Sequence, residues 1–270
     1  MTASSVTRWT ERIARADHLA DRYPAAADIL RFYAALAGYQ QSVATRQTRP
    51  RQLTDLPSLV LDEIGDFLAW LEDAAPPRLA AAAAEMRRLE RSSWQALVDE
   101  RLGRRDGQFE ATAAAAPRVF VVEALLQPLA ERLAAGHGPS TERLAPSQAR
   151  SPALCPFCGD QPSVGALREE AEGAKRSLVC GLCLTEWPYL RLLCPACGEQ
   201  RFDALPVFTS ETVPGARIDA CDTCRAYVKT IDLTKDGHAV PCVDDLATVS
   251  LDLWAREQGY ARLRSNLLMT

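Results

Sequence analysis

The chain has 270 residues, of which 47% are hydrophobic and 24% are charged. This is ordinary globular composition, so it predicts a packed core and excludes a chain that is disordered throughout. The formal charge is −4, and it lies after residue 153, where 12 basic residues face 16 acidic ones. Because nucleic acid is held largely by Lys and Arg, we expect no nucleic-acid partner for this acidic part.

The apolar stretches are interrupted by charged residues well before the roughly 18 residues of a membrane span. Residues 1–11 also lack the apolar core of a secretory signal. We therefore expect no membrane span and a cytoplasmic protein. In a reducing compartment, clustered cysteines bind metal or do redox work more often than they form structural disulfides.

Residues 1–135 are predicted to form a helical domain of four to six helices packed as a bundle. Three segments place their apolar residues on one helix face. These faces are Ile29, Phe32, Tyr33, Leu36 and Tyr39; Val60, Ile64, Phe67, Leu68 and Leu71; and Val122, Leu125, Leu126, Leu129 and Leu133. The segment 78–102 is rich in good helix formers. Prolines, which are tolerated at helix starts, stand near the expected starts at Pro24, Pro57, Pro77 and Pro117.

Residues 136–153 contain Gly, Pro, Ser and Thr without apolar periodicity, which predicts a linker. The cysteine-rich part that follows has short apolar runs and β-branched residues, which favour hairpins. A last helix is expected after Pro241, within a C-terminal helix and tail at 243–270. Asp244 or Asp245 could cap this helix, and its apolar stripe would be Leu246, Val249 and Leu253.

The cysteine-rich part repeats internally. The run Cys155-Pro156-Phe157-Cys158-Gly159 recurs as Cys194-Pro195-Ala196-Cys197-Gly198. Second pairs follow after 21 and 23 residues, at Cys180 and Cys183 and at Cys221 and Cys224. The repeat predicts two tandem modules, 154–193 and 194–242, each with four cysteines.

Two C-x-x-C turns on facing hairpins give the tetrahedral four-sulfur geometry that suits zinc or a single iron. We therefore assign Cys155, Cys158, Cys180 and Cys183 to one metal site, and Cys194, Cys197, Cys221 and Cys224 to another. Each module is too short to fold on a hydrophobic core alone, so a bound metal would stabilise it. Disulfides within the pairs, as in thiol oxidoreductases, and iron–sulfur clusters are the alternatives.

The ninth cysteine, Cys242, precedes the expected last helix. It could be a thiol of low pKa near a helix N-terminus or a small buried residue. His18, His137 and His238 lack metal-ligand spacing and are interpreted as surface residues, although His238 could stand behind the second site. The aromatics of Trp187-Pro188-Tyr189 and Trp254 are interpreted as core residues. With no phosphate loop, nucleophile elbow or catalytic carboxylate pair in the sequence, we expect a protein that is not an enzyme.

The order of these motifs resembles the formate dehydrogenase accessory protein FdhE family. The resemblance is carried by the four C-x-x-C pairs, Thr185-Glu186-Trp187, Tyr227 and Lys229, Asp244-Asp245-Leu246-Ala247, Leu251-Asp252, Glu257-x-Gly259-Tyr260-x-Arg262 and Asn266-Leu267. It is dense over residues 154–268 and looser before them, chiefly from Phe32-Tyr33 to Gln40-Gln41.

This resemblance implies an N-terminal helical domain followed by two rubredoxin-like four-cysteine modules, with iron as the favoured ion and zinc possible. It also implies a cytoplasmic maturation factor, or chaperone, that binds the catalytic subunit of formate dehydrogenase before export. The alternatives are a thiol- or iron-based redox protein and a zinc-ribbon protein that binds nucleic acid, against which the acidic charge of the cysteine half argues.

Overall fold

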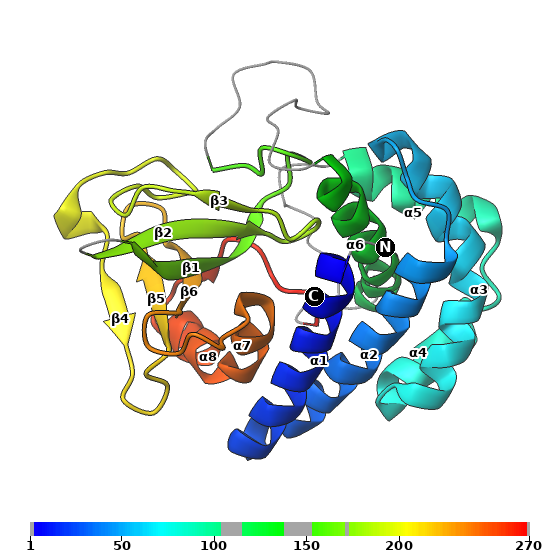
Figure 1. Ribbon diagram of the computed structural model, residues 1–270, viewed down its shortest axis with the longest axis horizontal. Helices are drawn as coiled ribbons and strands as arrows, with labels where there is room; N and C mark the ends of the chain where they lie inside the picture. Colours follow the sequence, from blue (N-terminus) through cyan, green and yellow to red (C-terminus); the bar gives the residue numbers. More distant parts are fainter. Residues whose placement is uncertain (1–2, 104–114, 138–152, 171–172, 269–270) are drawn as a thin grey trace.

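A computed structural model describes residues 3–103, 115–137, 153–170 and 173–268 (Figure 1). The helices precede the sheet in the chain and lie beside it. They are α1 (Ala3–Arg22), α2 (Ala27–Arg46), α3 (Leu56–Ala74), α4 (Pro77–Met86), α5 (Arg91–Gly103) and α6 (Ala116–His137). The strands are β1 (Pro162–Glu170), β2 (Gly173–Cys180), β3 (Glu186–Pro188), β4 (Val207–Thr209), β5 (Ala216–Ala220), β6 (Ala226–Asp232) and β7 (Ala261–Arg262), with α7 (Pro241–Ala247) and α8 (Val249–Glu257) between β6 and β7.

The predicted helical bundle is confirmed, and its three apolar faces lie in α2, α3 and α6. Pro57, Pro77 and Pro117 stand within the first two residues of α3, α4 and α6, whereas Pro24 begins a short 3₁₀ turn before α2. None of the helices in the described ranges combines the length and hydropathy that a bilayer span requires.

The segment 78–102, which is rich in good helix formers, is divided into α4 and α5 by a turn at 87–90. The turn sequence Arg87-Arg88-Leu89-Glu90 contains only good helix formers, so helix propensity gave no sign of the break. Both helices pack against α3 and place Ala83, Met86, Trp94 and Val98 in the core. Tertiary packing therefore overrides local propensity here.

The cysteine-rich part forms one sheet with the strand order β3-β2-β1-β6-β5-β4. The long β1–β2 hairpin carries the first module, and β5 and β6 carry the second. Parallel pairing of β1 with β6, from Gly165–Thr230 to Leu167–Asp232, joins the modules edge to edge. β7 pairs in parallel with an earlier part of β6. The boundary between modules at residues 193 and 194 stays a prediction.

The last helix is interrupted at Thr248, so α7 and α8 replace the single helix expected. The hydroxyl of Thr248 donates to the carbonyl oxygen of Asp244 at 2.9 Å. Beyond the break, Leu251 and Ala255 lie in the core, whereas Leu253 is 55% exposed. The expected apolar stripe is therefore wrong at Leu253.

Three clusters of buried residues hold the parts together. The first joins the predicted faces of α2, α3 and α6 to the cysteines of the first module. The second packs α7 between α1 and α2, with Val243 and Leu246 among the buried side chains. The third lies between the sheet and α8. The first module and α7 are therefore in contact with the helical domain.

Candidate metal centres

All four C-x-x-C turns close with the same backbone hydrogen bond. The N–H of the first cysteine donates to the carbonyl oxygen five residues later. The pairs are Cys155–Asp160 at 2.8 Å and Cys180–Thr185, Cys194–Glu199 and Cys221–Ala226 at 2.9 Å each. The four turns thus share one backbone conformation despite their different sequences, and this conformation directs both cysteines of each pair toward one point.

The residue that follows the second cysteine has a positive φ in every turn. The values are 80° at Gly159, 79° at Gly198, 55° at Leu184 and 59° at Arg225. Glycine adopts this conformation at little cost, but Leu and Arg do so at roughly 1–2 kcal/mol. Two of the turns therefore hold strained backbone within the surrounding sheet.

The turns bring the predicted cysteines together in two groups, Cys155, Cys158, Cys180 and Cys183, and Cys194, Cys197, Cys221 and Cys224, with the sulfurs of each group within 4.8 Å of one another. Across the turns, the closest sulfur pairs are 3.4–3.6 Å apart in the first group and 3.7 Å apart in the second. Four sulfurs about 2.3 Å from a central ion would be about 3.8 Å apart. All eight are free cysteines, because a disulfide would require about 2.05 Å. The donor set and spacing fit one metal ion in each cluster.

Backbone N–H groups also point at the sulfurs. The N–H groups of Leu182 and Cys183 lie 3.4 Å from the sulfur of Cys180, and that of Ala196 lies 3.4 Å from the sulfur of Cys194. Such donors stabilise thiolate charge and orient the ligands.

The thiol pKa values diverge within each cluster. Hydrogen bonds from the other three sulfurs lower the pKa of Cys155, whereas burial and the neighbouring sulfurs raise that of Cys180. In the second cluster burial opposes ionisation of Cys221, but hydrogen bonds from Cys224 and Cys197 lower its pKa overall. A cluster of four close thiols thus readily forms one thiolate, and further ionisation requires a compensating positive charge.

All four cysteines of the first cluster are buried, although Cys158 also lines a cavity of about 400 Å³. The four cysteines lie in the same apolar core as Phe67 of α3 and Leu125 of α6. Directly after the first turn, Asp160 accepts a hydrogen bond from Arg101 of α5 at 2.6 Å. Arg101 also pairs with Glu123 of α6. The first cluster is therefore fastened to the helical domain by apolar packing and by buried ion pairs.

Arg264 in the C-terminal tail completes this ion-pair group, 3.3 Å from Glu123 and 3.4 Å from Asp160. Burial alone would raise the pKa of Glu123, but the charges of Arg101 and Arg264 lower it overall. No sequence pattern indicated this group, because its members lie far apart in the chain.

The second cluster is open. Cys194 and Cys221 are buried, but Cys197 and Cys224 are exposed. A cavity of about 180 Å³ beside it has walls that come only from residues 176–263, with no contribution from the helical domain. The two clusters thus share ligands and turn geometry but differ in how exposed their cysteines are.

The remaining candidate residues are the ninth cysteine, the three histidines and three aromatic residues. Cys242 is half-buried at the start of α7, and burial raises its pKa, so the alternative of a low-pKa thiol is wrong. His18 and His238 are exposed, and neither belongs to a cysteine cluster. The side chain of His137 and most of the predicted linker lie outside the described residues. Trp187 and Tyr189 are buried, and Trp254 packs against Phe208 with ring centroids 4.8 Å apart.

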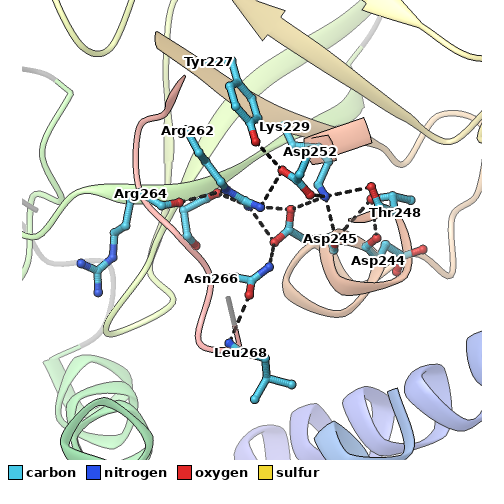
Figure 2. Close-up of polar contacts among 11 residues, drawn as sticks. Tyr227, Lys229, Asp244, Asp245, Thr248, Asp252, Arg262, Arg264, Asn266 and Leu268 are labelled. Atoms are coloured by element: carbon cyan, nitrogen blue, oxygen red, sulfur yellow. Dashed lines mark hydrogen bonds and ion pairs between the residues drawn. The ribbon is translucent and has the colours of Figure 1, made fainter. Parts of the chain in front are cut away.

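A buried network of charges lies between β6, α7, α8 and the tail (Figure 2). Lys229 is fully buried, and its Nζ lies 3.2 Å from Oδ1 of Asp245 and also pairs with Asp252. Arg262 donates to Asp245 at 2.7 Å and to Asp252 at 2.9 Å. Two positive charges therefore balance two negative ones.

Neutral donors and acceptors complete the network. Tyr227 donates to Asp252 and Asn266 donates to Asp245, both at 2.7 Å. Lys229 also donates to the carbonyl oxygens of Asp245 and Thr248 at 2.7 and 3.1 Å. The break between α7 and α8 thus supplies acceptors for the buried lysine.

Asp244 and Asp245, the two residues predicted as candidate helix caps, make different contacts. The N-cap of α7 is Val240, so the prediction of Asp244 as the cap is wrong; Asp244 lies inside the helix, accepts from the N–H of Val240 at 2.7 Å and also pairs with Arg15. Asp245 is no cap: burial would raise its pKa, but Arg262 and Lys229 lower it overall, so it is an ionised partner in the network.

Two family models match the cysteine-rich part and the C-terminal part of the chain. The central domain of FdhE matches residues 154–191, and the C-terminal domain of FdhE matches residues 193–269. An FdhE homolog of Aquifex aeolicus is 47% identical over 116 residues, which cover 42% of this chain and 41% of that protein.

Other relatives match nearly the whole chain. An FdhE homolog of Pseudomonas aeruginosa is 31% identical over 93% of this chain and 86% of that protein. One from Stutzerimonas stutzeri is 33% identical over 96% of this chain and 88% of that protein. The crystal structure of the FdhE protein from Pseudomonas aeruginosa has a TM-score of 0.74 at 27% identity and covers 97% of this chain and 95% of that one. Sequence and fold agree over nearly the full length, and this chain belongs to the FdhE family.

Proposed function

We propose that this protein is a cytoplasmic accessory factor for formate dehydrogenase, which binds the catalytic subunit during maturation and before export. It would not itself catalyse a reaction. Each cysteine cluster would hold one metal ion, with iron favoured over zinc. The observation that carries this proposal is the pair of four-cysteine clusters in a fold that matches FdhE over nearly its full length.

The clusters fit the metal on chemical grounds. Four cysteine sulfurs suit tetrahedral zinc and mononuclear iron alike. An iron ion would supply one-electron redox chemistry, whereas zinc would supply none. The residues of this chain hold the sulfurs in place through the four backbone-closed turns. The preference for iron comes from the family resemblance.

The direct test has two measurements. Protein purified without oxygen should contain two metal ions per chain, and immobilised protein should retain a purified formate dehydrogenase catalytic subunit. Iron would also give a red protein with visible absorption. If no complex forms and deletion of the gene leaves formate oxidation unchanged, the accessory role is wrong.

The exposure of Cys197 and Cys224 favours a second candidate, a thiol- or iron-based redox protein. Exposed ligands would let a partner approach the second centre closely. A reversible one-electron change of the visible spectrum would support this reading. A colourless protein that contains only zinc when isolated without oxygen would remove the iron version.

A further inference from the structure

Exposed apolar side chains gather around the cavity beside the second cluster. Leu192, Phe202 and Val207 line this cavity, and their exposed fractions are 50%, 79% and 52%. They are three of the five large hydrophobic residues that are exposed among the described residues. We call these three residues the apolar patch. Such a concentration on one face marks an interaction surface.

The cavity has the size of one large side chain. It measures about 180 Å³, and a cavity of roughly 150 Å³ with apolar walls accepts a benzene ring. Leu205, Pro206 and Leu263 add apolar walls. A Leu, Met or Phe side chain of a partner would fit this space.

Three arginines and one aspartate line the cavity beside Cys194 and Cys221. Arg176 and Arg217 share the single carboxylate of Asp219, at 3.2 and 2.8 Å. Arg191, which also lines the cavity, is exposed and donates to the carbonyl oxygen of Ala174, which does not neutralise its charge. Arg191 is therefore available to pair with an acidic group of the partner.

The patch lies beside an edge of the sheet. Val207 begins β4, the last strand in the order β3-β2-β1-β6-β5-β4, and Figure 1 shows β4 on the side of the sheet away from α1–α6. An edge strand presents N–H and C=O groups to an added peptide. The geometry suits a partner segment in extended conformation.

From these features, and resting on the proposed function, we infer that the client subunit docks here through an extended segment whose large apolar side chain enters the cavity and whose neighbouring carboxylate meets Arg191. Cys194 and Cys221 form part of the cavity wall. A docked segment would therefore lie against the second metal centre and leave the first untouched.

The test compares the affinities of full-length variants for the purified catalytic subunit, with biolayer interferometry as the readout. Phe202→Ser should weaken binding at least tenfold, because it removes a large exposed anchor. The matched control is Leu253→Ser, which removes a 55% exposed leucine on α8, outside the cavity wall. It should change the affinity less than twofold. Metal content and circular dichroism of each variant confirm that the fold is retained.

A charge series tests the second half of the inference. Arg191→Gln should weaken binding about threefold, and Arg191→Glu should weaken it further and reverse the salt dependence. If affinity is unchanged in both, the partner carries no carboxylate at this wall and that part of the inference is overturned.

The outcomes separate the two proposals. If the unmodified protein binds the subunit and Phe202→Ser binds equally well, the docking surface is wrong while the accessory role stands. If the unmodified protein does not bind, the accessory role itself fails, and the docking inference fails with it. If the unmodified protein is a dimer that Phe202→Ser splits into monomers, the occupant is a second copy of this chain and the inference is overturned.

Discussion

The first cysteine cluster lies in a core shared with α3 and α6, whereas the second lies in a wall made only of sheet, loop and tail residues. All four cysteines of the first are buried, and two of the second are exposed. Their ligand sets, turn hydrogen bonds and sulfur spacings are nearly the same. The difference therefore lies in what surrounds the ligands.

The two clusters would therefore have different roles, although their ligand sets are the same. A metal in the first cluster would stabilise the junction between the helical domain and the sheet, because Asp160 beside it pairs with Arg101 of α5. A metal in the second would stabilise its own module and remain accessible to a partner. Three experiments test this difference between the clusters, and a fourth tests the buried charge network.

Loss of one ligand in each cluster should give the largest contrast. Cys180→Ser should cost the first metal and the helical fold together, since a structural four-cysteine site contributes about 10–16 kcal/mol to folding. Cys224→Ser should cost only the second metal and leave helical melting near that of the unmodified protein. Thermal melts at 222 nm and metal content per chain measure both. Equal melting of the two variants would contradict the division.

A substitution in the buried charge network should have the second-largest effect. Lys229→Met leaves Asp245 and Asp252 with one buried cation between them, so we expect a loss of about 3–5 kcal/mol in the free energy of unfolding. Urea denaturation measures this loss. Lys175→Met is the matched control, because Lys175 forms an exposed pair with Glu170 that should contribute less than about 1 kcal/mol. A similar small effect in both variants would show that the network contributes little.

The two clusters should also release their metal ions at different rates. With excess chelator, we expect two phases, the faster at least tenfold quicker and assigned to the second cluster. Alkylation followed by mass spectrometry should label Cys197 and Cys224 first, because they are exposed. A Cys242→Ser background removes the ninth thiol from the count. A single release phase, or early labelling of Cys155, would contradict the difference in access.

The sequence allowed the cysteine pairs and the helix faces to be predicted because both depend on local spacing. The network around Lys229 escaped prediction because its charges come from β6, α7, α8 and β7, and only the pairing of these elements brings them together. The interruption at Thr248 was not predicted for a related reason. The carbonyl oxygens near it accept hydrogen bonds from Lys229, which lies about twenty residues earlier in the chain. Long-range polar contacts carry no periodic signal.

Substitution of a turn glycine should give the smallest of the predicted effects. Gly198 has a φ of +79° and open space where a Cβ would stand, so Gly198→Ala tests backbone strain without a clash. We expect a loss of about 1–2 kcal/mol, seen as faster metal release from the second cluster with unchanged helical melting. The control Gly65→Ala also has open space but lies in α3 with ordinary φ, where alanine should stabilise by roughly 0.5–1 kcal/mol. Because Leu184 and Arg225 adopt positive φ without glycine, an unchanged Gly198→Ala variant would show that metal-site closure alone holds these turns.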